Sequence, residues 1–188
     1  MRLQLSDEQK KTLRLWWRSL QAREKGDPPL PQFNHQGRGE RAKLRRCQTP
    51  EDVLLQASLH HLALALFASD KPKPQQLLDL ALVAGILSHV DQDDFAHKFA
   101  ASLGSKKADR PAMSEMRFQQ LQTSRDPDDF YRQLRRAVDL LGNKLDVIDL
   151  AQSLFDWCHE QRENVEPAKR LKLRWATDYY TASLTKNA

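Results

Sequence analysis

The chain has 188 residues, of which 40% are hydrophobic, so it can bury the core of one domain or of two small ones. Its formal net charge is +5 and its isoelectric point is near 9.3, which suits nucleic acid or an acidic protein surface as a partner. Two cysteines make no disulfide framework, and no signal peptide or membrane-spanning run is present, so we expect a cytoplasmic protein without membrane contact.

The first predicted helix begins after Ser6, whose hydroxyl can cap it, and extends to about Lys25. Its adjacent Trp16 and Trp17 recur with leucines at helical spacing. That spacing favours core packing over stacking on nucleic-acid bases. Because the two residues are adjacent, we expect one of them to be partly exposed or at an interface.

The next segment, GRGERAKLRRC, carries five cations within nine residues, with Leu44 as its one large apolar side chain. Two interpretations stay open. The segment is either a solvated helical turn or a phosphate-contacting element, for which the bidentate guanidinium group of arginine is well suited. The cations are Arg38, Arg41, Lys43, Arg45 and Arg46.

The middle of the chain is predicted to supply central helices. Thr49 and Pro50 can open a helix, and the segments Val53–Ala68 and Leu77–Leu87 are strongly apolar. A shorter amphipathic helix is expected over Asp91–Leu103. The basic loop that follows it is a candidate boundary between two helical halves.

The stretch MSEMRFQQLQTSRDPDDFYRQLRRAVDLL predicts two short helices joined by a turn. Asp126 can cap the second helix, and Pro127 suits its first position. Three arginines crowd that helix although like charges repel at this spacing, which points to a polyanionic partner. They are Arg132, Arg135 and Arg136, and they flank an apolar stripe of Phe130, Leu134, Ala137, Val138 and Leu141.

Two further helices are predicted towards the end of the chain. Asp146 can cap the first, which turns Trp157 and several leucines inward. The second is expected to begin at Pro167 and to pack through Leu171, Trp175 and Tyr179. Its first half is crowded by Lys169, Arg170, Lys172 and Arg174.

These patterns predict an all-α fold of about eight helices in two small helical bundles. β-branched residues are sparse, and no alternating segment or hairpin signal occurs. The candidate boundary gives an N-terminal bundle over residues 1–104 and a C-terminal bundle over residues 105–188.

Catalysis is not indicated by the sequence. It has no phosphate-binding glycine loop and no HExxH motif, and Cys158 and His159 are adjacent, so they point apart on a helix. His89, Asp93 and His97 could align three metal ligands on one helix, but a helix break near Asp91 would spoil the spacing. We therefore expect no enzyme activity, no metal and no cofactor.

The basic clusters are the feature that calls for a partner. They are not interleaved with Asn or Gln, so we expect contacts to the nucleic-acid backbone that are independent of sequence. Two alternatives remain: a helical adaptor whose basic faces bind acidic protein surfaces, and a metal-dependent helical enzyme built on His89, Asp93 and His97.

The order of these motifs resembles the CasB family, the small subunit of the type I-E CRISPR surveillance complex, Cascade. The features that carry the resemblance are the early pair Trp16-Trp17, RAKLRR at Arg41–Arg46, MRFQQLQ at Met116–Gln122, LRRAVDLL at Leu134–Leu141, Trp157, and RWATDYY at Arg174–Tyr180. They span nearly the whole chain. None is specific alone, but their order and spacing are.

The resemblance implies an all-α, non-catalytic subunit present in two copies, between the backbone subunits and the large subunit of Cascade. It implies contacts with the guide RNA and target DNA, and help in holding the displaced DNA strand. The motifs carry over Arg41, Lys43, Arg45, Arg46, Arg117, Arg135, Arg136 and Arg174 as backbone contacts. Local charge density adds Arg38, Arg132, Lys169, Arg170 and Lys172.

Overall fold

A computed structural model describes residues 3–23, 27, 29–67, 71–107 and 109–185. Over these residues the fold is all-α, as the sequence predicts. The ten helices are α1 (Asp7–Ser19), α2 (Arg38–Arg46), α3 (Pro50–Val53), α4 (Ala57–Leu66), α5 (Pro74–Leu87), α6 (Phe99–Gly104), α7 (Glu115–Thr123), α8 (Pro127–Leu140), α9 (Val147–Glu160) and α10 (Leu171–Leu184). Two 3₁₀ turns lie at Pro31–Phe33 and Pro167–Lys169.

Four two-residue strands accompany the helices in the described residues, where the sequence indicates none. They are β1 (Gln92–Asp93), β2 (Lys106–Lys107), β3 (Arg110–Pro111) and β4 (Lys144–Leu145). The pairing of β1 with β4 is parallel, and that of β2 with β3 is antiparallel. None of the helices in the described ranges is long and apolar enough to cross a membrane.

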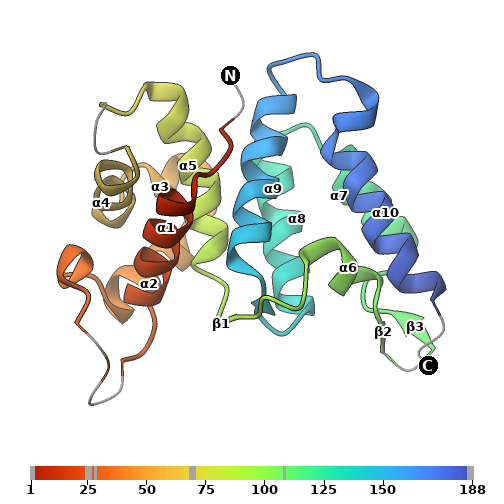
Figure 1. The fold of residues 1–188 in the computed structure, drawn as a ribbon, viewed down its shortest axis with the longest axis horizontal. Coiled ribbons are helices and arrows are strands. Elements are labelled where there is room, and N and C mark those ends of the chain that lie inside the picture. The colour runs from red at the N-terminus through yellow and green to blue at the C-terminus, as the bar shows by residue number, and fades with distance from the viewer. Residues whose placement is uncertain (1–2, 24–26, 28, 68–70, 108, 186–188) are drawn as a thin grey trace.

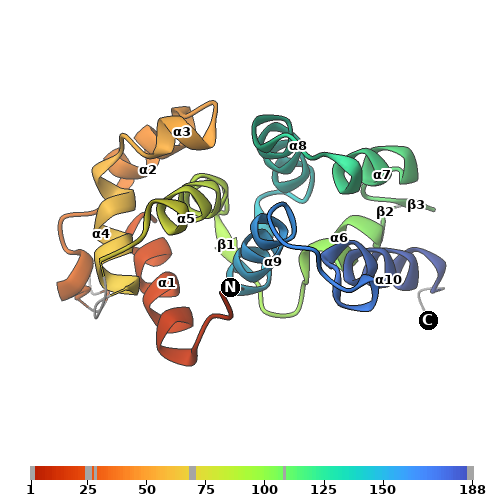
Figure 2. The same cartoon turned by 90° about the horizontal axis from the view of Figure 1, so that it is seen from above.

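Helix α5 lies at the centre of the molecule. Every residue from Leu80 to Leu87 is buried, as expected for a helix that is apolar on all sides. It packs against α2, α3 and α4 on one side and against α8 and α9 on the other (Figures 1 and 2). The core is therefore continuous across the middle of the chain.

The helices form two groups, α1–α5 and α6–α10 (Figure 1). Helix α5 belongs to the first group and packs against the second. In the second group α6 packs closely on α10, where the backbone of Gly104 lies against the carbonyl of Tyr179. The boundary at residue 104 stays a prediction. We note that α6 precedes that boundary but packs on α10.

The predicted caps form as expected. The Ser6 hydroxyl accepts a hydrogen bond from Gln9 N, and Thr49 caps α3 in the same way. Asp126 accepts from the first amides of α8, and Asp146 from those of α9. Each cap satisfies amides that have no partner within the helix.

All four tryptophans lie in the core, which confirms the packing interpretation. Trp16 is fully buried, and Trp17 is only 7% exposed, so the expectation that one of the pair is partly exposed is wrong. The indole N–H groups of the adjacent pair both have partners: Trp16 donates to Ser58 O and Trp17 to Val90 O, both at 3.1 Å. Trp157 stacks on Phe130 with 4.1 Å between ring centroids.

The predicted helix over Asp91–Leu103 is wrong, because α6 begins only at Phe99. Two carboxylates bind backbone amides in a non-helical segment instead: Asp93 Oδ1 accepts from Val147 N at 3.0 Å, and Asp94 Oδ1 from Ala96 N at 3.1 Å. Short acidic side chains compete with helix formation in this manner.

Three other boundaries differ from prediction. The first helix ends at Ser19, and Lys25 lies outside the described residues. The helix predicted from Pro50 divides into α3, which ends at Val53, and α4, which begins at Ala57. Ala68, the predicted end of the apolar segment, is also outside the described residues. The last helix begins at Leu171, whose amide donates to the Glu160 carboxylate, while Pro167 opens a 3₁₀ turn.

Candidate nucleic-acid interface

The cations of α2 do not all serve the same purpose. Arg41 donates from Nε to Ser88 O at 2.8 Å and from Nη2 to Val90 O at 3.1 Å, and it forms an ion pair with Asp91. Its side chain is only 16% exposed. Because arginine can satisfy the last carbonyls of a helix, Arg41 acts as a tie between α2 and the end of α5.

The other cations of α2 are more accessible. Arg45 Nη1 lies 3.9 Å from the Asp91 carboxylate, and its side chain is 39% exposed. Lys43 pairs with Glu40 one turn earlier at 2.7 Å. Arg38 and Arg46 are exposed. This group can reach a phosphate without breaking a contact between helices.

Helix α8 carries its arginines on different sides. Arg135 faces α2, where its Nη1 donates to Cys47 O and Gln48 Oε1, both at 3.2 Å. Arg136 faces α7. Arg132 is exposed and pairs with Asp129 at 3.4 Å. The cluster predicted from sequence is thus divided between two surfaces.

His89 lies beneath the arginines of α2 and α8, and it is only 4% exposed. Neither of its ring nitrogens has a hydrogen-bond partner within the described structure. Burial lowers its pKa to about 4, and the nearby Arg135, Arg45 and Arg41 add to the shift. The imidazole is therefore neutral, and the local positive charge comes from guanidinium groups alone.

A groove between α7 and α8, which we call the α7–α8 groove, holds two of the predicted cations. It has a volume of about 770 Å³, and its walls include Arg117, Gln120, Asp129, Gln133 and Arg136. Hydrogen bonds from Ser124 and Gln133 lower the pKa of Asp129, which keeps that carboxylate ionised. Two exposed guanidinium groups therefore share the groove with one engaged acid.

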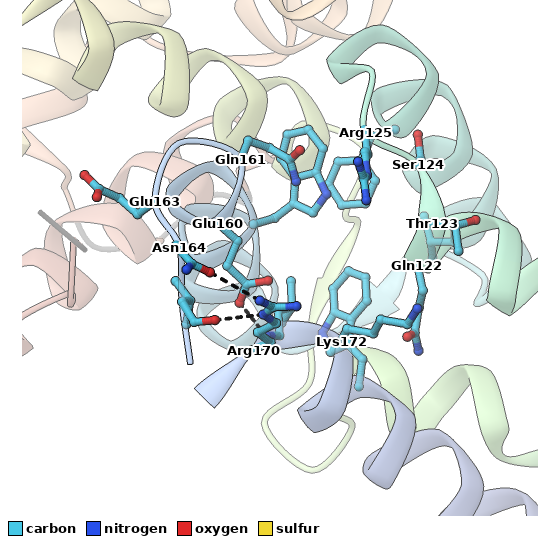
Figure 3. Close-up of a pocket in the computed structure, with 16 residues that line it drawn as sticks. Gln122, Thr123, Ser124, Arg125, Glu160, Gln161, Glu163, Asn164, Arg170 and Lys172 are labelled. Carbon is cyan, nitrogen blue, oxygen red and sulfur yellow. Dashed lines mark hydrogen bonds between the residues drawn. The ribbon is translucent and has the colours of Figure 1, made fainter. Parts of the chain in front are cut away.

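A second pocket, which we call the loop pocket, lies where the α7–α8 turn meets the segment before α10 (Figure 3). Its volume is about 510 Å³, and Arg125, Arg170 and Lys172 line it with Glu160 and Glu163. Arg170 Nε donates to Val165 O at 2.8 Å, so its guanidinium group braces the loop. The loop pocket and the α7–α8 groove share Leu121, Thr123 and Ser124, so they adjoin.

Two predicted cations near α10 have local partners. Arg174 donates to Asp156 Oδ2 and Ser153 Oγ, both at 2.9 Å, and Asp156 is only 4% exposed. Arg174 therefore compensates a buried charge between α9 and α10. Lys169 is exposed and pairs with Glu166 at 2.8 Å.

Sequence reasoning missed Arg125. It stands in the turn before α8, outside the clusters of cations, and only the folded chain brings it to the same pocket as Lys172. The nearest signal in the sequence is its place beside the Asp126 cap, which indicates an exposed turn.

The possible metal ligands His89, Asp93 and His97 do not share a helix. His89 is buried, Asp93 pairs with Arg14 at 3.1 Å, and His97 pairs with Asp94 at 2.8 Å. In the described residues no group of three or more His, Cys, Asp or Glu side chains could hold a metal ion. The alternative of a metal-dependent enzyme required these three side chains on one helix, and the described structure does not arrange them so.

Comparison with known proteins agrees with this architecture. The family model described as CRISPR-associated protein Cse2 matches residues 40–180, which is more than half of the chain. No curated protein gives a sequence match. The crystal structure of CasB from Thermus thermophilus matches with a TM-score of 0.62 and 21% identity, over 94% of this chain and 100% of that chain.

At that identity the CasB structure supports the fold, whereas the family model identifies the sequence. The all-α architecture and the ordered basic motifs are consistent with both. The chain therefore belongs to the Cse2 family of CRISPR-associated proteins, the CasB small-subunit family that its motifs resemble.

Proposed function

We propose that the chain is a non-catalytic scaffold subunit of Cascade that binds nucleic acid through its phosphate backbone. In this role it contacts the guide RNA and target DNA region and stabilises the displaced strand. Its protein partners are the backbone and large subunits and a second copy of itself. The observation that carries the proposal is the α7–α8 groove, which Arg117 of α7 and Arg136 of α8 both line.

The geometry of the groove supports backbone binding. Arg117 lies on α7 and Arg136 on α8, and a short turn that ends in the Asp126 cap joins the two helices. The packing of α7 on α8 therefore sets the spacing of the two arginines. The adjoining loop pocket adds Arg125 and Lys172. A cationic surface that continues from one hollow to the next can follow a single strand.

The side chains available to read bases are few along these walls. Gln133 Nε2 already donates to Asp129 at 2.6 Å. Gln120 is exposed and remains able to contact a base edge. We therefore expect binding that depends strongly on salt and only weakly on sequence.

The experiment is a salt titration of binding to an unstructured single-stranded DNA. The test variant is Arg117→Ala/Arg136→Ala, and the matched control is Lys71→Ala/Lys73→Ala, which removes the same charge from an exposed segment elsewhere. The log–log slope is roughly −0.7 for each neutralised phosphate. We expect the slope of the test variant to be less steep by the equivalent of about two neutralised phosphates. The control variant should keep the wild-type slope.

Equal slopes for the two double variants would contradict the groove as the binding surface. A loss confined to some DNA sequences would show base reading, against the proposal. Salt-dependent binding of an acidic protein, without binding of any nucleic acid, would support the adaptor alternative instead.

A further inference from the structure

A third hollow lies between α1 and the turn that follows β1. It has a volume of about 580 Å³, and its lining includes Lys10, Lys11, Arg14, Arg18 and Phe95. None of these residues belongs to the motifs that indicate the family. The hollow combines four cations and an aromatic ring with two carboxylates, Asp7 and Asp93. Cations beside an exposed aromatic ring are typical of single-strand binding sites.

Phe95 is 65% exposed, and the turn that carries it is well anchored. Asp94 Oδ1 accepts from Ala96 N at 3.1 Å, and Asp94 Oδ2 pairs with Lys144 at 3.1 Å and with His97 at 2.8 Å. The backbone of Asp94 also donates to Leu145 O at 3.1 Å. The fold thus holds a large apolar ring in solvent on a fixed turn.

The ring of Phe95 is already partnered on one side by a cation. The guanidinium carbon of Arg14 lies 4.2 Å from the ring centroid. Arg14 is fixed in turn by Asp93, whose carboxylate lies 3.1 Å from Nε. Because the ring is still mostly exposed, its remaining surface is open to a second planar group.

The cations around the ring favour an anionic ligand. Lys11 and Arg18 are exposed and stand two turns apart on α1, roughly 10 Å along the helix axis. Lys10 pairs with Asp7 at 3.0 Å, and Asp93 is engaged by Arg14. Lys11 and Arg18 therefore remain to contact charge on either side of the ring.

We propose that Phe95 and the basic side of α1 form a stacking subsite for one base of a single-stranded nucleic acid. The base lies on the open surface of the Phe95 ring, and Lys11 and Arg18 contact the flanking phosphates. The inference rests on the proposed function for its ligand class. It adds a second surface, which reads the flat face of a base without selecting its identity.

The test uses a thymidine oligonucleotide that carries a single 2-aminopurine, whose fluorescence falls when it stacks. Phe95→Leu removes the ring and keeps an apolar side chain, whereas Phe95→Tyr keeps a ring. We expect Phe95→Leu to lose the quenching and to weaken binding about tenfold, with an unchanged salt slope. Phe95→Tyr should keep both signals, and Leu55→Ala, at another exposed apolar residue, should change neither.

Quenching and affinity that are the same in Phe95→Leu as in the wild type would overturn the stacking subsite. If Phe95→Leu is unchanged while Arg117→Ala/Arg136→Ala weakens binding in the same assay, the proposed function stands and this inference fails. No oligonucleotide binding by the wild type at low salt would overturn both. Phe95-dependent binding of polyglutamate alone would assign the hollow to an acidic peptide and overturn the nucleic-acid assignment.

Discussion

Individual arginines of this chain look alike in sequence but have different roles in the fold. Arg41 and Arg38 belong to the same basic segment, yet only Arg41 reaches the carbonyls at the end of α5. Sequence cannot distinguish them, because the acceptors lie 47 to 49 positions further along the chain. Charge density predicts that a partner exists, and tertiary contacts decide whether it is another molecule.

Replacing Arg41 therefore tests the division between structural and binding cations. Arg41→Ala removes the guanidinium donor to Ser88 O and the closest cationic partner of Asp91, which keeps its hydrogen bond from Asn143. We expect it to lower the free energy of unfolding by about 1 to 3 kcal/mol. Arg38→Ala is the matched control and should change it by less than about 0.5 kcal/mol. Urea denaturation measures both, and an unchanged midpoint for Arg41→Ala would contradict the structural role.

His89 makes a residue-scale prediction about pH. Its pKa is about 4 in the folded chain, against 6.5 as the ordinary value. Between these values the unfolded chain binds a proton that the folded chain does not, so stability falls as the pH drops from 6.5 towards 4. The loss approaches about 3 kcal/mol at the lower end.

We expect His89→Leu to flatten the dependence of unfolding free energy on pH across this window. Carboxylates such as Asp91, whose pKa is also lowered, contribute a separate loss that both proteins share. His60→Ala, at an exposed histidine, should keep the wild-type profile. Denaturation at several pH values measures the difference, and equal slopes in all three proteins would rule out His89 as its source.

At the scale of elements, close contact between helices sets strict limits on residue size. A Cβ atom on Gly104 would meet the carbonyl of Tyr179, so α6 and α10 would have to move apart. Gly39 in α2 has open space around it. The same substitution should therefore have opposite effects at these two helical glycines.

Gly104→Ala should lower the free energy of unfolding by about 1 to 3 kcal/mol, as overpacking does. Gly39→Ala should leave it unchanged or raise it by up to about 1 kcal/mol, since alanine favours a helix. Thermal unfolding of the two variants compares them directly. A stabilised Gly104→Ala protein would show that α6 and α10 can separate at little cost.

Elements were predictable where local signals agree, and less so where distant contacts compete. The turn at Asp126–Pro127 and the helix after it follow from capping chemistry alone. The segment after Asp91 has an amphipathic pattern that favours a helix. However, the Asp93 carboxylate accepts from the amide of Val147, and the Asp94 carboxylate pairs with Lys144, both about fifty residues further along the chain. The candidate site was predictable as a set of cations, whereas the presence of Arg117 and Arg136 in one groove depends on the packing of α7 on α8.

At the scale of the whole molecule, the two groups of helices share a continuous core. α5 from the first group packs on α8 and α9 from the second. The amino-terminal segment is also tied across, because Gln152 of α9 accepts from Leu5 N and donates to Leu3 O, both at 3.0 Å. A rigid frame of this kind keeps basic surfaces on α1, α7 and α8 at fixed separations.

This shared core predicts that the two groups unfold together, even though the sequence suggests two bundles. The tryptophans divide between them: Trp16 and Trp17 report on α1, and Trp157 and Trp175 on α9 and α10. Each pair can be replaced with phenylalanine in turn, which leaves a fluorescence signal from one group. Within each variant, the denaturation midpoint from fluorescence should equal that from far-UV circular dichroism, which reports on all helices. Different midpoints within one variant would mean that the burial of α5 against α8 and α9 is too weak to couple the bundles, and that each is a folding unit of its own.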